Sequence, residues 1–191
     1  ATGIYYESLI INKPLTILGR IGSSPGFVGG GSGIAVTLLS NASGSIVAGV
    51  VITKWDQGIF VNGSSDCKIY DNIMSLMGNS GIALEGASAA NNIIYNNIFQ
   101  DNKIAINLTE YATSNTIYSN IINSSRIGIL VESSGNIIYW NSFINNENQI
   151  VIGMFVNIWD HGYPDGGNYW STHISIDVFC GQYQNETGSD G

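Results

Sequence analysis

One short phrase, Ile-Tyr-x-Asn, recurs along the middle of the chain at intervals of 21 to 25 residues, ending at Asn72, Asn97, Asn120 and Asn141. A second column keeps the same period and reads Gly58-Ile59, Gly81-Ile82, Ala105-Ile106, Gly128-Ile129 and Gln149-Ile150. Runs such as Gly-Ile-x-Leu are too short for helices, and a repeat without a helix cannot bury its apolar side alone. Successive repeats must therefore stack on one another.

Stacking of this kind predicts an all-β fold, a right-handed single-stranded parallel β-helix of about six or seven rungs spaced ~4.8 Å apart. Only 10% of the residues are charged and 24 are glycine, a composition that favours short strands and tight turns. We expect the solenoid to occupy residues 1–156. Residues 157–191 form a different, irregular segment rich in aromatics and glycine, suited to capping or assembly.

Two polar or aromatic columns accompany the apolar ones. Asparagine suits the corners of the rungs because it tolerates left-handed backbone conformations and its amide can bond to the same amide one rung away. The tyrosines that follow the inward isoleucines should point outward as an aromatic ladder, made of Tyr70, Tyr95, Tyr118 and Tyr139. A sugar chain or a neighbouring subunit could stack on that ladder, or the rings could simply stack on each other for stability.

The Ile-Tyr-x-Asn and Gly-Ile-x-Leu columns resemble the parallel β-helix repeats of the NosD family, which is related to the carbohydrate-binding and sugar-hydrolase repeats. The opening phrase over residues 3–19 is similar to the first rung of that family, where a short cap helix usually precedes it. Residues 157–170 resemble a tail found after such repeats in archaeal surface proteins. The resemblance implies the fold and a surface location, and it says little about function.

The tail also contains candidate ligands for Ca²⁺, which prefers carboxylate and amide oxygens beside flexible turns. The candidates are Asp160, Asp165, Asn168, Asp177 and Asp190. In the alternative interpretation the aspartates only form turns while the aromatic residues fold over the end or side of the solenoid.

Cys67 and Cys180 could form one disulfide in an oxidising compartment, or remain two buried thiols. Glycosylation acceptor sequences occur at Asn41, Asn62, Asn107, Asn123 and Asn185. The net charge of -8 argues against nucleic acid as a partner, because such binding depends on Lys and Arg. We also expect no membrane span, because the chain has no run of 18 apolar residues.

Catalysis is not expected, because the carboxylates of the repeats do not share a column. Glu85 and Glu132 follow equivalent strands two rungs apart, which places them ~10 Å from each other. Nor does the spacing of His, Cys and Met suit a copper site. We therefore expect a noncatalytic extracellular protein of a cell-surface layer, sheath or filament, whose partners are copies of itself joined through solenoid ends and tail. The alternative is a surface protein that binds or processes carbohydrate.

Overall fold

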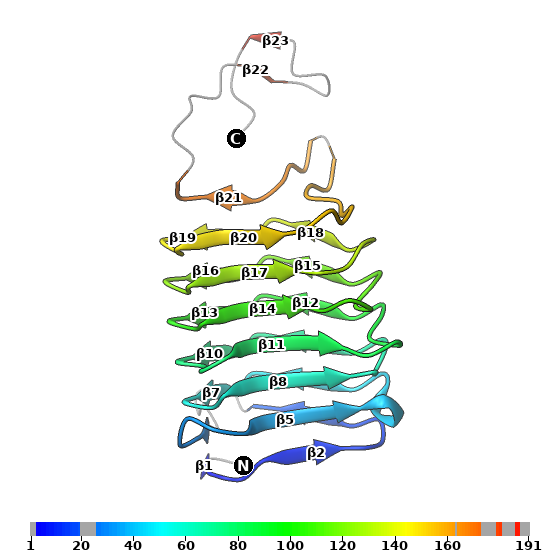
Figure 1. Cartoon of the computed structure of the whole chain (residues 1–191), viewed down its shortest axis with the longest axis vertical. Helices are drawn as coiled ribbons and strands as arrows, with labels where there is room; N and C mark the ends of the chain where they lie inside the picture. The colour runs from blue at the N-terminus through cyan, green and yellow to red at the C-terminus, as the bar shows by residue number, and fades with distance from the viewer. Residues whose placement is uncertain (1–2, 20–25, 163, 173–178, 181–185, 188–191) are drawn as a thin grey trace.

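The fold is a solenoid built from three parallel sheets, as Figure 1 shows for a computed structural model of the chain. The structure describes residues 3–19, 26–162, 164–172, 179–180 and 186–187. Each turn contributes one short strand to each sheet, so that strands three apart in sequence are hydrogen-bonded neighbours. The prediction of a parallel β-helix is therefore confirmed.

Sheet A contains eight strands. They are β1 (Ile4–Tyr5), β4 (Gly26–Val28), β7 (Val51–Thr53), β10 (Ile73–Ser75), β13 (Ile98–Gln100), β16 (Ile121–Asn123), β19 (Ser142–Ile144) and β21 (Tyr169–Trp170). Sheet B contains seven strands. They are β2 (Leu9–Ile11), β5 (Ile34–Leu39), β8 (Gln57–Asn62), β11 (Ser80–Glu85), β14 (Ile104–Leu108), β17 (Ile127–Val131) and β20 (Asn148–Ile152).

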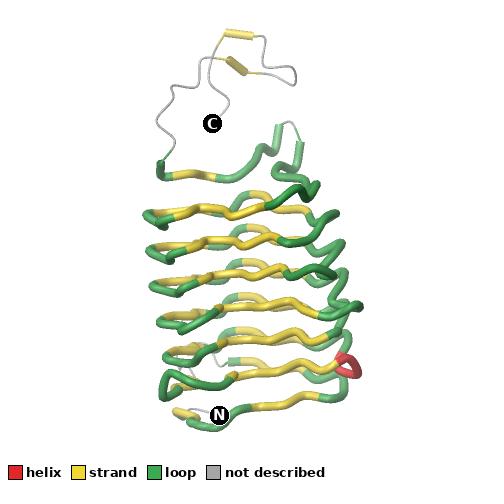
Figure 2. The backbone as a smooth tube through the Cα atoms, viewed as in Figure 1, coloured by secondary structure: helices red, strands yellow, loops and turns green. Residues whose placement is uncertain are grey.

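Sheet C contains six strands. They are β3 (Thr16–Leu18), β6 (Ile46–Ala48), β9 (Lys68–Tyr70), β12 (Ile93–Tyr95), β15 (Thr116–Tyr118) and β18 (Ile137–Tyr139). A separate antiparallel pair joins β22 (Phe179–Cys180) to β23 (Glu186–Thr187). The helix drawn in red in Figure 2 is η1 (Ser40–Ala42), one 3₁₀ turn between β5 and β6.

The solenoid is right-handed. In Figure 1 the front strands of sheet B run from left to right while the chain climbs from the N-terminus towards the later turns, which is the right-handed sense. Most strands have three residues, and in β9, β12 and β15 of sheet C the central residue is buried while its two neighbours are not. The core is therefore a set of vertical columns, of which Ile69, Ile94, Ile117 and Ile138 form one that is fully buried.

The glycine column of sheet B makes room for large side chains from sheet A. A methyl group on Gly81 would lie 2.7 Å from Cδ1 of Phe99, and one on Gly128 would lie 2.9 Å from Cδ1 of Phe143. The same column contains alanine at Ala105, where the corresponding residue of the next strand in sheet A is Ile122 instead of an aromatic ring. Small residues therefore stand where rings must fit, which explains the Gly-Ile phrase of the repeat.

Each corner of this kind contains two consecutive residues with different roles: the first adopts a left-handed backbone conformation, and the second is the buried asparagine. Asp71, Asn96, Ser119 and Trp140 adopt the left-handed conformation, with φ between 53° and 55°. The asparagines after them do not, so the predicted left-handed role of Asn72 and its equivalents is wrong. The physical reason is direction: the left-handed residue turns the chain, and the next side chain then points into the core.

The solenoid register continues beyond residue 156. Ile158 forms a parallel bridge with Ile137, and β21 pairs with β19 so that Trp170 lies opposite Phe143. The two rings are stacked with centroids 4.6 Å apart. Ile158 thus completes the seventh turn in sheet C and β21 begins an eighth in sheet A, so the solenoid register extends into the C-terminal segment as far as Trp170.

We predict that Gly128→Ala lowers the free energy of unfolding by about 1–3 kcal/mol, the usual cost of overpacking a core. The added methyl group would also lie 2.3 Å from the carbonyl oxygen of Gln149. Gly30→Ala is the matched control, because a methyl group there meets nothing within 4 Å. Urea denaturation of both variants measures the effect, and equal midpoints would contradict the packing explanation.

Candidate functional site

The buried asparagines form a continuous ladder of hydrogen bonds. Oδ1 of Asn97 accepts from the backbone N–H of Asn72 at 3.1 Å and from its Nδ2 at 3.0 Å. Nδ2 of Asn97 donates to the carbonyl oxygen of Ile69. The backbone N–H and Nδ2 of Asn97 also donate to Oδ1 of Asn120 in the next rung. The four asparagines of this ladder, Asn72, Asn97, Asn120 and Asn141, are completely buried. The ladder therefore satisfies the polar backbone of a corner that faces the core.

The tail extends this ladder, which the sequence did not reveal. Oδ1 of Asn168 accepts from the N–H and Nδ2 of Asn141, both at 3.0 Å. A second ladder through Asn115 and Asn136 ends in the same manner on Asn157. Asn168 was a candidate calcium ligand, and that assignment is wrong, because its carbonyl oxygen is occupied by two donors inside the solenoid.

The other candidate metal ligands do not converge either. Oδ1 of Asp160 accepts from the backbone N–H of Gly162 at 2.8 Å, and Oδ2 of Asp165 lies 2.9 Å from Nδ1 of His161. Asp177 and Asp190 lie outside the described residues. Within the described ranges, no group of three or more His, Cys, Asp or Glu side chains is placed to hold a metal ion. Calcium binding by the tail is therefore not supported.

The four tyrosines of the ladder stack face to face along sheet C. Their ring centroids are 4.8, 5.1 and 5.3 Å apart, and their planes are within 14° of parallel. His161 from the tail stacks on the last ring, Tyr139, at 4.5 Å. Because neighbouring rings occupy the faces between them, a sugar cannot stack between the rungs. The ladder offers ring edges and hydroxyl groups to a ligand instead.

The stacking also changes the acidity of the tyrosines. Partial burial raises the pKa of Tyr95, and the neighbouring Tyr70 and Tyr118 raise it further. Burial likewise raises the pKa of Tyr139, with contributions from Tyr118 and Asp165. The neutral phenols are therefore favoured in the folded protein.

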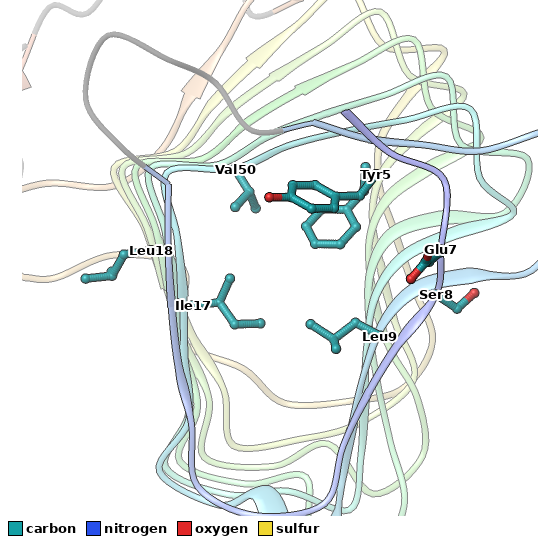
Figure 3. A pocket seen from close by; sticks show the side chains of 8 residues that line it. Tyr5, Glu7, Ser8, Leu9, Ile17, Leu18 and Val50 are labelled. Atoms are coloured by element: carbon teal, nitrogen blue, oxygen red, sulfur yellow. The ribbon is translucent and has the colours of Figure 1, made fainter. Parts of the chain in front are cut away.

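An apolar cavity of about 310 Å³ opens at the N-terminal end of the solenoid. Figure 3 shows Tyr5, Leu9, Ile17 and Val50 pointing into the opening, while Glu7 and Ser8 lie at the rim. We call this cavity the N-terminal mouth. The strands around it, β1, β2 and β3, end sheets A, B and C, and each pairs on one side only within the described residues. The mouth therefore combines exposed apolar side chains with unpaired strand edges.

At the opposite end, β20 is the last strand of sheet B among the described residues, and its burial decreases sharply from that of β17. Ile152 is 40% exposed, whereas Val131, its neighbour in the column, is fully buried. Apolar residues beyond the strand are exposed as well, namely Met154, Phe155 and Val156.

Of the two alternatives for the cysteines, Cys67 fits the second, because it is a free thiol buried in the hydrophobic core. Its Sγ lies 3.4 Å from the carbonyl oxygen of Ser65, and burial raises its pKa. The side chain of Cys180 lies outside the described residues. A thiol enclosed by the solenoid interior cannot reach an outside partner without opening the rungs.

The glycosylation acceptor asparagines differ in accessibility. Asn41 and Asn62 are exposed. Asn107 and Asn123 lie in strands and are half-buried, with Oδ1 of Asn107 enclosed and Oδ1 of Asn123 accepting from Ser124 at 3.0 Å. Asn185 lies outside the described residues. In the described part of the chain, no helix is long and apolar enough to cross a bilayer.

The carboxylates of the rungs are dispersed. Glu85 ends β11 and Glu132 follows β17, with β14 between the two strands. Glu147 lies 3.8 Å from Arg126, and both side chains are more than 60% exposed, so this ion pair contributes little stability.

These features define a parallel β-helix solenoid. The chain belongs to the NosD family, described as periplasmic copper-binding protein, whose model matches residues 27–174, more than half of the chain. No curated protein and no solved structure matches the chain significantly.

Copper in the family description does not fit the donors that the structure describes. Met74 and Met77 fill the core beside other apolar side chains, and Cys67 is enclosed there too. His161 is engaged with Asp165 and stacked on Tyr139. A copper site needs several such donors around one point, and no three His, Cys, Asp or Glu side chains of the described residues are grouped to hold a metal ion. We therefore derive no chemistry through copper.

Sequence reasoning missed three contributors: His161, Trp140 and Asn157. His161 and Trp140 surround the end of the tyrosine stack, with ring centroids 4.5 and 5.0 Å from Tyr139. The signal for Asn157 was available, because it lies 21 residues after Asn136 in the second ladder. No pattern in the sequence pointed to His161.

We predict that Asn97→Ala lowers the free energy of unfolding by at least about 3 kcal/mol, because each buried polar group left without a partner costs about 1–3 kcal/mol. The N–H and Nδ2 of Asn72 and the carbonyl oxygen of Ile69 would all lose Asn97. Asn62→Ala is the control, since Asn62 is exposed, and we expect a change within about 0.5 kcal/mol. Similar denaturation midpoints for both variants would refute the role of the ladder.

We also predict that stability decreases as the pH rises above about 10, the ordinary tyrosine pKa. Because the raised pKa values of Tyr95 and Tyr139 belong to the folded state, the unfolded chain loses its phenol protons first. The stabilisation is complete below that pH and is lost as the pH passes the folded pKa. Denaturation midpoints near neutral and at alkaline pH measure the effect. Tyr95→Phe should reduce the loss, and Tyr111→Phe, at a ring 54% exposed, should not.

Proposed function

We propose that the protein is a noncatalytic scaffold of the cell envelope that assembles end to end with copies of itself. The family description as periplasmic supports the location. The observation that carries the assembly is that the two ends of sheet B present the same inward columns, in which Leu9 and Ile150 are half-buried and Ile152 is 40% exposed, whereas Ile11 is already buried. Leu9 belongs to the column that runs through Val36 and Ile129 to Ile150. Ile11 and Ile152 share the neighbouring column.

In this assembly β20 of one copy pairs in parallel with β2 of the next. The pairing repeats the geometry of β17 and β20 inside one chain, so Ile150 would pack on Leu9 and Ile152 on Ile11. It covers the N-terminal mouth and supplies partners to both strand edges. A contact between two different ends does not close on itself, so repetition produces a filament.

In the filament, two strands would compete for one position in sheet A. β21 of the lower copy and β1 of the upper copy would both occupy the strand position between β19 and β4. β1 has only two residues and both are exposed, whereas Trp170 of β21 is stacked on Phe143. We propose that β1 gives way, which brings Trp170 into the column of Phe27.

The stacked tyrosine rings of sheet C leave no ring face free between rungs for a sugar. The alternative, carbohydrate binding or processing, thus has no specific observation in its favour.

The test uses one blocking variant at each end. Leu9→Asp should disable the mouth, and Ile150→Asp should disable the opposite edge, because a carboxylate buried without a partner is costly. We expect the unchanged protein to form filaments by electron microscopy and each variant to remain monomeric in light scattering. An equimolar mixture of the variants retains one intact interface and should form only heterodimers.

Ile10→Asp is the matched control, because Ile10 lies in the same strand but points outward and is 66% exposed. This variant should still form filaments. A wild-type protein that stays monomeric at every concentration, or an Ile10→Asp variant as defective as Leu9→Asp, would overturn the proposal. Circular dichroism of each variant separates loss of assembly from loss of folding.

A further inference from the structure

The outer face of sheet A carries no charged side chain from β7 to β19. Its outward residues are Val51, Thr53, Ile73, Ser75, Ile98, Gln100, Ile121, Asn123, Ser142 and Ile144. The whole chain has a net charge of -8. Sheet B, by contrast, presents Glu85 at the end of β11, and sheet C presents Lys68 in β9. Depletion of charge is a property of the centres of protein interfaces.

An isoleucine stripe runs along this face. Ile73, Ile98 and Ile121 are direct neighbours in register, and they are 39%, 38% and 43% exposed. Beside them Ser75, Gln100 and Asn123 form a neutral polar stripe in the same register. The face is therefore flat and periodic, with the repeat of the rungs.

We infer that this face binds sheet A of a second copy, which joins neighbouring filaments side by side. The inference rests on the proposed end-to-end assembly. Two copies with a charge of -8 each repel one another over most of their surfaces, so an uncharged face is where they can approach. A second solenoid also has the same spacing of rungs, so its isoleucine stripe can interdigitate with this one along the whole contact.

The size of the face sets the condition for binding. The five strands from β7 to β19 span ~20 Å at a spacing of ~4.8 Å, and three residues span ~10 Å. The face thus offers about 200 Å² per copy, well below the ~800 Å² per partner of stable complexes. Free monomers should not pair through it. Filaments repeat the contact at every copy, so that two filaments are held together by many weak contacts at once and bind more tightly than two monomers.

Ile98→Lys tests the inference, because it places a charge at the centre of the stripe. Thr116→Lys is the matched control, since Thr116 lies in the column of Lys68 on the outer face of sheet C. We expect the unchanged protein and Thr116→Lys to form paired or bundled filaments in electron microscopy. Ile98→Lys should form single filaments of the same length, and Leu9→Asp should form neither.

Salt provides a second measurement, because screening weakens the repulsion between the acidic surfaces but leaves apolar contacts intact. Bundling of the unchanged protein should increase with sodium chloride, measured by turbidity and sedimentation. Single wild-type filaments at all salt concentrations, or bundles of Ile98→Lys equal to those of the wild type, would overturn the lateral contact alone. A wild-type protein without any filaments would instead overturn the end-to-end assembly.

Discussion

The fold depends on one buried interaction, the amide ladder that passes from Asn72 to Asn168. Each rung must turn sharply, and the turn brings backbone N–H groups towards an apolar interior where an unpaired donor is costly. An asparagine at the inward position solves this problem, because its Oδ1 accepts two hydrogen bonds from the asparagine of the preceding rung. Its Nδ2 then donates to a backbone carbonyl oxygen, so the side chain itself is also satisfied. The ladder aligns the rungs as well as joining them.

This alignment explains how the repeat tolerates unequal lengths. The segment from Leu84 to Asn92 is longer than the equivalent segment from Val131 to Asn136, yet both pairs of residues remain in register. The extra residues lie in the loop between sheets B and C. Strands and inward corners are constrained by stacking, while loops outside the sheets are not. Variation along the chain therefore accumulates on the surface and leaves the core columns unbroken.

The same stacking makes the ends and faces of the molecule the places where function can reside. The described interior is filled by packed apolar columns, and its buried asparagines form hydrogen-bonded ladders. The described residues also present repeated surfaces, namely matching columns at the two ends of sheet B and one uncharged face on sheet A, and these are the surfaces that the proposed assembly uses. The copper of the family description has no counterpart in the described donors, so family membership establishes the fold more firmly than the chemistry.

The sequence by itself determined the repeat, the parallel stacking, the inward isoleucines and the columns of Asn72 and Tyr70, because periodic spacing in a solenoid converts directly into vertical alignment. Tertiary structure alone decided the role of Gly81 beneath Phe99, since this contact joins different sheets and different rungs. It also decided that Asn168 completes the ladder and that His161 covers the tyrosine stack. These residues lie where the period ends, and beyond the last regular repeat only the chain's actual path shows which open position each side chain fills.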